Sequence, residues 1–182
     1  CCLAAAVILG LVVVTVMHGS DSLDAWWQHL MVNARTTAGI AAGKVFNVVG
    51  GGAIAYAVVP LGGAVVLALL SRWRAAIYWL GCLVASTLVV QAVKIAFGRA
   101  RPPDMRVTSD PLGSFPSGHT ANAATIVLAL AVITGAVWVR WVGACYVVCM
   151  LLSRTYLSAH WLTDTLGGVL IGVGAALLVT AF

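Results

Sequence analysis

Three short polar clusters stand out in a chain that is otherwise largely apolar. Their members are cations, histidines, serines and one carboxylate, and they fall at Lys94 with Arg101-Pro102, at Pro116-Ser117-Gly118-His119, and at Ser153-Arg154 with His160 and Asp164. Because the neighbouring residues are apolar, exposure to water does not explain why these polar residues occur here. Together they contain the groups that bind and transfer a phosphate, so we interpret them as parts of one phosphate site.

The cations and backbone donors suit a tetrahedral phosphate dianion. Lys94, Arg101 and Arg154 supply positive charge, and arginine contacts phosphate oxygens through paired N–H groups. Ser117 and Gly118 come at the predicted start of an apolar helix, where unpaired N–H groups and the helix dipole favour an anion. We therefore predict that these residues surround the phosphate.

The histidines supply a nucleophile and an acid. His160 and Asp164 are four residues apart at the start of a predicted helix, so they lie on one helix face. A carboxylate bonded to one imidazole nitrogen would fix the tautomer and leave the other nitrogen free to attack phosphorus. We predict that His160 is the nucleophile, Asp164 its orienting partner and His119 the general acid for the leaving oxygen. Water would then hydrolyse the phosphohistidine.

The acidic residues argue against a metal mechanism. Two-metal sites need several clustered carboxylates or histidines. This chain has five acidic residues, all of them Asp, and only Asp164 lies within a histidine cluster. We predict no catalytic metal and no cofactor.

The composition places the predicted site in a membrane protein. Hydrophobic residues make up 62% of the 182 residues and charged residues 8%, whereas about a quarter of the residues of a soluble domain are charged. The length accommodates about six spans of roughly 20 residues and leaves no room for a second folded domain. We predict an all-α polytopic membrane bundle, with about six transmembrane helices in a single domain over residues 1–182.

The apolar runs and their interruptions place the elements. We expect spans at 1–17, 48–70 and 75–97, a fourth from 117 or 119 to a turn at 139–141, a fifth to 156 and a sixth from 161, with a short interfacial amphipathic helix within 22–47 and a loop over 98–115. Because the chain begins Cys1-Cys2 without Met, we expect a truncated or processed N-terminus and an incomplete first span. The glycines at 50–52 and Pro60 predict close packing or a kink.

This layout brings the clusters to one membrane surface. About 40 residues, or two spans of roughly 20, separate His119 from His160, so the chain crosses the bilayer and returns between them. The loop over 98–115 stays at one membrane surface and keeps Lys94 and Arg101 on the same side as the histidines. All three clusters are therefore expected to converge.

The clusters, in this order and at this spacing, resemble the three-part signature of the type 2 phosphatidic acid phosphatase superfamily, which also includes vanadium haloperoxidases and bacterial acid phosphatases. No motif position departs from the pattern. The resemblance implies metal-independent dephosphorylation with His160 as nucleophile and His119 as proton donor. It also implies a lipid phosphate drawn from the bilayer as substrate, membrane lipids as the surroundings and no nucleic-acid partner.

Charge alone does not fix the orientation. The turns opposite the clusters carry Arg72, Arg74 and Arg140, whereas the cluster side holds seven basic residues and all five acids. Raw counts of basic residues would place the clusters inside. The membrane members of the superfamily usually act at the outer face of the bacterial cytoplasmic membrane, so the resemblance implies a multi-pass protein of that membrane with an outward-facing site.

Some interpretations stay open. Arg99 and Arg106 lie outside the signature and are interpreted as lipid-headgroup or interface anchors, or as contacts to a second phosphate. A lipid phosphotransferase would use the same phosphohistidine with another acceptor. A lipid-binding or lipid-translocating protein would also keep a phosphate site, although binding alone needs neither acid nor nucleophile. The expected substrate class is a lipid phosphate or polyprenyl (pyro)phosphate, whose members share the terminal phosphate and differ in an apolar tail.

Overall fold

The computed structural model describes residues 20–107 and 112–180 of the chain. Every secondary-structure element in these two ranges is a helix, which confirms the predicted fold class. The predicted span at 1–17 and the expectation for the N-terminus lie outside the described residues. The other five predicted spans each correspond to helices.

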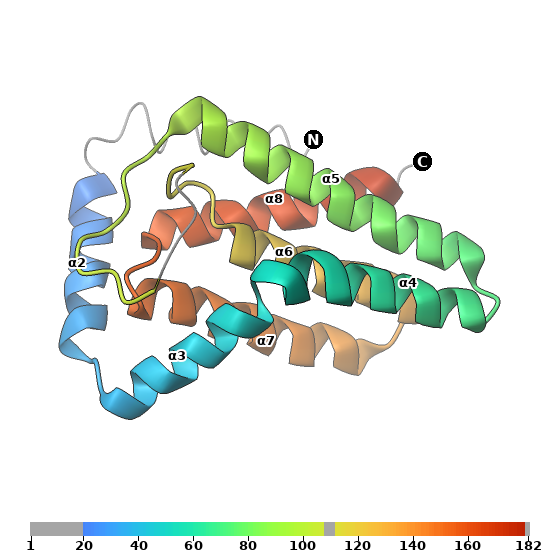
Figure 1. The fold of residues 1–182 in the computed structure, drawn as a ribbon, viewed down its shortest axis with the longest axis horizontal. Helices are drawn as coiled ribbons and strands as arrows, with labels where there is room; N and C mark the ends of the chain where they lie inside the picture. Colours follow the sequence, from blue (N-terminus) through green and yellow to red (C-terminus); the bar gives the residue numbers. More distant parts are fainter. Residues whose placement is uncertain (1–19, 108–111, 181–182) are drawn as a thin grey trace.

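The helix α2 (Ser20–Asn33) lies crosswise at one end of the bundle (Figure 1). Its Leu23 and Trp26 are exposed, and its Asp24 and Gln28 are buried. The helix therefore turns its polar face toward the protein and an apolar face outward. Such an arrangement suits a helix lying in the membrane interface.

The amphipathic helix predicted within 22–47 is wrong in its second half. After α2 has ended, the Thr36 hydroxyl accepts a hydrogen bond from the backbone N–H of Gly39 at 3.0 Å and caps a new helix, α3 (Thr37–Val49). Basic residues interrupt the apolar pattern here, which is why the sequence favoured an interfacial position. In the structure, α3 begins an apolar helical segment over 37–69 that is long enough to cross a membrane.

Two irregularities divide this long segment. The first is the glycine triplet at 50–52, where Gly52 has a φ of 53°, a conformation that glycine adopts without strain. The second is a π-helical turn, η1 (Ile54–Val58), which leads directly into α4 (Val59–Leu69). Pro60 lies in the first turn of α4, where helices tolerate proline. The predicted irregularity around these residues is confirmed.

Four further helices complete the bundle: α5 (Trp73–Phe97), α6 (Gly118–Thr134), α7 (Val137–Tyr156) and α8 (Leu162–Thr180). Lys94 lies in the last turn of α5, and the left-handed Gly98 ends that helix with a φ of 52°. The chain then leaves the bundle in the predicted loop.

The turn between α6 and α7 lies at Gly135 and Ala136. The prediction of a turn at 139–141 is wrong, because these residues belong to the start of α7. A charged Arg140 between two apolar runs suggested the turn. The left-handed backbone of Gly135, with a φ of 67°, is what ends α6.

Helix α6 occupies the middle of the bundle and packs against α5, α7 and α8 (Figure 1). Helix α4 packs along α5, and α3 packs along α7. The segment over 37–69, α5, α7 and α8 are each long and apolar enough to cross a membrane, whereas α6 has 17 residues and is shorter. The described part of the chain is a helical membrane bundle.

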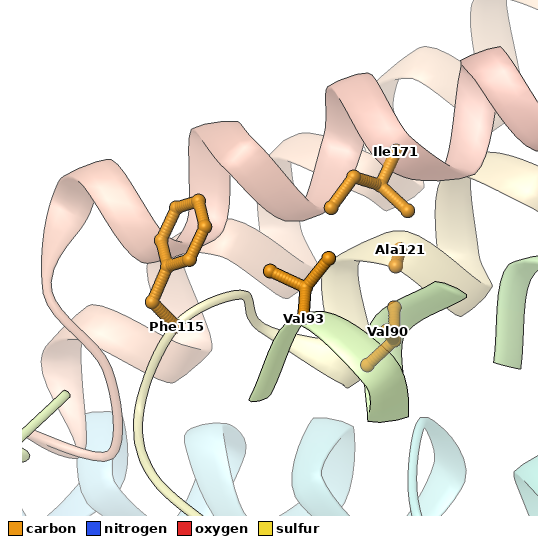
Figure 2. Packing of buried hydrophobic residues seen from close by; sticks show 5 residues of the cluster. All are labelled: Val90, Val93, Phe115, Ala121 and Ile171. Carbon is orange, nitrogen blue, oxygen red and sulfur yellow. The ribbon is translucent and has the colours of Figure 1, made fainter. Parts of the chain in front are cut away.

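A buried apolar cluster fixes the segment that leads into α6. Figure 2 shows its members, which come from α5, from the loop before α6, from α6 and from α8: Val90, Val93, Phe115, Ala121 and Ile171. Phe115 is 1% exposed and lies directly before the Pro116-Ser117-Gly118-His119 cluster. Burying apolar side chains removes them from water, so this packing holds the polar cluster in place.

Candidate active site

One cavity of about 390 Å³ lies where α5 ends and α6 begins. Its walls come from α3, the glycine triplet, η1, α5, the following loop, α6 and the end of α7. The lining residues are Asn47, Gly51, Gly52, Tyr56, Gln91, Lys94, Arg101, Gly118, His119, Arg154 and His160. The structure therefore brings members of all three polar clusters to one cavity. Of the predicted site residues, Ser117 and Asp164 do not line it and are fully buried beside it.

His160 lies in the short connection between α7 and α8 and is 3% exposed. Its Nδ1 is 2.7 Å from the carbonyl oxygen of Ser114, which can only accept, so Nδ1 carries the proton. Its Nε2 is 3.3 Å from Nη1 of Arg101, which can only donate, so Nε2 holds the lone pair. The unprotonated nitrogen, which a nucleophile requires, is the one beside a cavity cation.

Asp164 acts on His160 less directly than predicted. Its Oδ2 is 3.7 Å from Nδ1 of His160, which is beyond hydrogen-bond distance. The N–H at Nδ1 donates a hydrogen bond to the Ser114 carbonyl instead. Oδ2 accepts from the backbone N–H of Trp161 at 2.9 Å, and Oδ1 accepts from Arg99 at 2.6 Å. The carboxylate thus closes the first turn of α8 and influences the neighbouring imidazole mainly through its charge.

Burial sets the charge state of His160. The pKa of His160 is lowered to about 4, mainly because the charged ring would lose its hydration inside the protein. The Asp164 carboxylate raises this pKa, while Arg154 and Arg101 help to lower it. The imidazole is therefore neutral at pH 7, with its lone pair available.

His119 is the second residue of α6. Its Nε2 is 3.2 Å from the backbone carbonyl oxygen of Asn47, so this nitrogen carries a proton. A Cβ atom at Gly51 would lie 2.5 Å from Nε2, so the absence of a side chain there gives the imidazole its place. Because Nε2 is bonded to the protein, Nδ1 is the nitrogen that can exchange a proton with a leaving oxygen.

Neutral oxygens fix the three predicted phosphate-binding cations. Lys94 Nζ donates to the Gly113 carbonyl at 3.3 Å, and Arg101 Nη2 donates to the same oxygen at 2.8 Å. Arg154, which is 1% exposed, donates from Nη1 to Oδ1 of Asn47 at 2.6 Å. These carbonyl and amide oxygens orient the cations and are themselves uncharged.

Ser117 and Gly118 have different environments. The backbone N–H of Ser117 donates to the carbonyl oxygen of Asp164 at 2.9 Å, so the structure uses this predicted phosphate donor to join α6 to α8. The Ser117 hydroxyl oxygen is buried without a hydrogen-bond partner. Gly118 begins α6 and lines the cavity, where a helix N-terminus favours an anion.

The PAP2 superfamily model matches residues 75–182, which is more than half of the chain. The chain belongs to the PAP2 superfamily. No curated protein sequence matches it.

Two solved structures share the PAP2 superfamily fold with this chain. One is a transmembrane PAP2-type phosphatidylglycerolphosphate phosphatase from Bacillus subtilis, with a TM-score of 0.84 and 22% identity over 98% of this chain and 94% of that one. The other is LpxE of Aquifex aeolicus, with a TM-score of 0.73 and 22% identity over 88% of this chain and 96% of that one. At this identity, the likeness shows the fold.

Several lining residues lie outside the PAP2 signature, and sequence reasoning missed them: Asn47, Gly51, Gly52, Tyr56 and Gln91. A polar amide within an apolar run was the available signal for Asn47 and Gln91. Gln91 also precedes Lys94 by three residues, which places both on one face of α5. The glycine triplet was interpreted as a packing feature, and it also forms part of the cavity wall.

Arg99 and Arg106, two of the arginines outside the signature, bind carboxylates of the protein. Arg99 pairs with Asp24 at 2.8 Å and with Asp164 at 2.6 Å. Arg106 pairs with the exposed Asp104 at 2.9 Å. The interpretation of Arg99 as a headgroup anchor or as a contact to a second phosphate is therefore wrong, because its guanidinium is held inside an ion-pair network.

Proposed function

We propose that this PAP2 superfamily protein removes the terminal phosphate of a lipid phosphate or a polyprenyl (pyro)phosphate through a phosphohistidine at His160. The observation that carries the proposal is the cavity itself. Its lining contains His160, whose unprotonated nitrogen lies beside Arg101, together with two further cations and a second histidine, His119. A nucleophile, a proton donor and fixed positive charge are the parts that phosphoryl transfer needs.

In the first step, Nε2 of His160 forms a bond to phosphorus while the bond from phosphorus to the lipid oxygen breaks. The electron pair of the broken bond stays on that oxygen. His119 enters this step as an imidazolium, gives the oxygen its Nδ1 proton and keeps its Nε2 proton bonded to the Asn47 carbonyl. Lys94, Arg101 and Arg154 balance the charge on the phosphoryl oxygens as it redistributes. The products are the phosphohistidine and a lipid alcohol, or a lipid monophosphate when the substrate is a pyrophosphate.

In the second step, water attacks the phosphorus of the phosphohistidine. His119, now a neutral imidazole, accepts a proton on Nδ1 from the attacking water, and the bond from phosphorus to Nε2 of His160 breaks. Inorganic phosphate leaves, and both imidazoles return to their starting states. A phosphohistidine divides one difficult displacement into two easier ones.

An apolar cavity beside the phosphate cavity supports a lipid substrate. It has a volume of about 210 Å³ and shares Tyr56 with the first cavity. Pro60 of α4 and Val84 and Leu88 of α5 line it. The two α5 side chains are exposed on the outside of the bundle. A tail in this cavity would reach the bilayer between α4 and α5 while its phosphate lies among the cations.

We also propose that the protein resides in the bacterial cytoplasmic membrane with the phosphate cavity at the outer face. The resemblance of the motifs supports this orientation. Arg72, Arg74 and Arg140 lie near the α4–α5 and α6–α7 turns, at the end of the bundle that this orientation places in the cytoplasm.

Phosphate release by the purified protein tests the function. The panel contains phosphatidate, polyprenyl pyrophosphate and phosphatidylglycerol phosphate, the last chosen because the Bacillus subtilis relative is named for it. We expect release in excess chelator, because the proposed steps use no metal. His160→Ala and His119→Ala should each lower kcat by about 100-fold or more, the size typical of lost acid–base or nucleophilic catalysis. His29→Ala, at an exposed histidine of α2, is the matched control.

Each alternative has its own outcome in this assay. A phosphotransferase would give a phosphorylated acceptor with little free phosphate, which lipid chromatography detects. A non-catalytic binding protein would bind the lipids and release nothing. Unchanged release by His160→Ala would overturn the nucleophile, and loss of activity in chelator would overturn the metal-free mechanism.

A further inference from the structure

Arg99 joins three separate parts of the protein beside the active site. Its Nη1 donates to Oδ1 of Asp164 at 2.6 Å and to the hydroxyl of Thr163 at 2.8 Å. Its Nη2 donates to Oδ2 of Asp24 at 2.8 Å. Its guanidinium also lies over the ring of Trp161, 5.7 Å from the ring centre. One residue of the loop after α5 therefore connects α2 with the start of α8.

Asp24 completes this connection from the buried face of α2. It is 1% exposed, and both of its oxygens accept hydrogen bonds. Oδ1 accepts from the backbone N–H of Thr163 at 3.0 Å, and Oδ2 accepts from the Thr163 hydroxyl at 2.6 Å and from Arg99. The negative charge of a carboxylate at the first turn of a helix also interacts favourably with the helix dipole. Asp24 thus fixes the start of α8.

The network reaches His160 through Asp164. Arg99 holds Oδ1 of this carboxylate, while Oδ2 bonds the backbone N–H of Trp161 and faces Nδ1 of His160 at 3.7 Å. The position of Asp164 relative to the imidazole therefore depends on Arg99 and on the first turn of α8. Asp24 holds both of these.

The charges in the network have a functional consequence. One guanidinium is shared by two buried carboxylates, so the group of Asp24, Arg99 and Asp164 carries a net charge of −1. When His160 attacks phosphorus, its imidazole gains positive charge. A remaining negative charge next to the ring stabilises that state more in the transition state than in the ground state. Without the Asp24 charge, Arg99 would neutralise Asp164 completely.

We propose that Asp24 is a positioning residue for the reaction: through Arg99 and Thr163 it fixes the Asp164 carboxylate beside His160 and preserves the negative charge that stabilises the phosphorylated imidazole. This inference rests on the proposed phosphohistidine chemistry. Asp24 touches neither cavity, so its effect belongs to the chemical step and not to phosphate binding.

Kinetics of Asp24→Asn test this inference, because the substitution keeps the size of the side chain and removes its charge. Hydrolysis is measured on a lipid phosphate and on p-nitrophenyl phosphate. The second substrate can occupy the phosphate cavity but has no lipid tail for the apolar cavity. We expect kcat to fall by about tenfold on both substrates, the size of a lost charged hydrogen bond, with KM unchanged within about twofold. Asp104→Asn, the same change in an exposed carboxylate that pairs with Arg35 and Arg106, should keep the wild-type values.

Two further measurements separate positioning from simple damage to the fold. The stoichiometry of inorganic phosphate binding gives the fraction of intact cavities, and kcat is expressed per intact cavity. Arg99→Lys keeps the positive charge but cannot span two carboxylates, so it should also lower kcat by about tenfold. The double variant should lose about as much as one single variant, because both changes interrupt one connection.

The outcomes are distinct. A wild-type kcat per intact cavity in Asp24→Asn overturns the positioning role while leaving the proposed function intact. A hundredfold loss in the double variant shows independent effects and also overturns it. If Asp24→Asn binds no phosphate, Arg99→Lys decides in the same way. A wild-type protein that turns over p-nitrophenyl phosphate but no lipid refutes only the substrate class, and one that turns over neither refutes the function and this inference together.

Discussion

At the scale of single residues, backbone carbonyls set the protonation of both histidines. The Ser114 carbonyl fixes the proton of His160 on Nδ1, and the Asn47 carbonyl fixes that of His119 on Nε2. A carbonyl only accepts, so each of these two nitrogens keeps its proton and the other nitrogen of each ring takes part in the chemistry. The chemistry therefore depends on where the loop before α6 and the end of α3 lie.

The lowered pKa of His160 gives a spectroscopic prediction. Because burial lowers this pKa to about 4, the ring stays neutral as the pH falls from 7 to 5.5 and gains a proton only near pH 4. Nitrogen NMR of 15N-histidine protein at pH 7 and 5.5 should show a neutral His160 with its proton on Nδ1. The signal is assigned by its loss in His160→Asn. A doubly protonated ring at pH 5.5 would contradict the burial of this group.

Asn47 should act on substrate binding through Arg154. Its side-chain oxygen accepts from the buried guanidinium at 2.6 Å, and a hydrogen bond to a charged group contributes about 1.5–3 kcal/mol. Asn47→Ala should therefore raise KM by about tenfold or more, with a smaller effect on kcat. Asn33→Ala, at the exposed end of α2, is the matched control. An unchanged KM for Asn47→Ala would show that Arg154 is oriented without it.

The sequence predicted the functional groups that are particular side chains, and it did not predict those that belong to the backbone. The cations and histidines were predicted because such residues are costly in an apolar chain. The Ser114 carbonyl was not, because every residue carries a carbonyl and only the fold shows where it points. Asp24 was missed for another reason: a carboxylate on an amphipathic helix is ordinarily solvated, and its burial appears only when α2 packs against α8.

At the scale of elements, the boundaries follow local backbone chemistry more than hydropathy. The cap at Thr36 and the left-handed Gly135 determine where α3 begins and α6 ends. Both signals are weak in an apolar sequence rich in alanine and glycine, so hydropathy placed the interfacial helix and one turn incorrectly. The long helices α5 and α8 were predicted well because their apolar runs are continuous, whereas Arg140 interrupts the run of α7 and its first turn was misplaced.

The groove between α4 and α5 yields a prediction for the lipid tail. Val84 lines the apolar cavity and is 55% exposed, so a larger side chain fits there without disturbing the core. Val84→Trp should displace part of the tail. At about 0.8 kcal/mol per buried CH₂, losing two methylenes raises KM for a long-chain lipid by about tenfold. Initial rates against lipid concentration measure this.

Two controls accompany that experiment. Hydrolysis of p-nitrophenyl phosphate by Val84→Trp should stay at the wild-type level, because this substrate has no tail. Ile77→Trp, on an exposed part of α5 away from the cavity, should leave both substrates unaffected. Equal rises in KM on both substrates would mean that the groove does not hold the tail.

At the scale of the whole molecule, the phosphate cavity lies where α5 ends and α6 begins, and Arg72, Arg74 and Arg140 lie near the turns at the other end of these helices. An outward-facing cavity predicts that the loop after α5 is accessible from outside the cell. In a background without native cysteines, Met105→Cys should react with a membrane-impermeant maleimide on intact spheroplasts. Leu70→Cys, in the turn between α4 and α5, should react only after lysis. The reverse pattern would place the site in the cytoplasm.

The central claim is that the phosphoryl group is transferred twice in one cavity, first to His160 and then to water. Each displacement inverts the configuration at phosphorus, and two displacements restore it. A lipid thiophosphate made chiral with oxygen isotopes is hydrolysed in isotopically labelled water, and the configuration of the released thiophosphate is determined. The phosphohistidine mechanism predicts net retention. Net inversion, the result of direct attack by water, would contradict it.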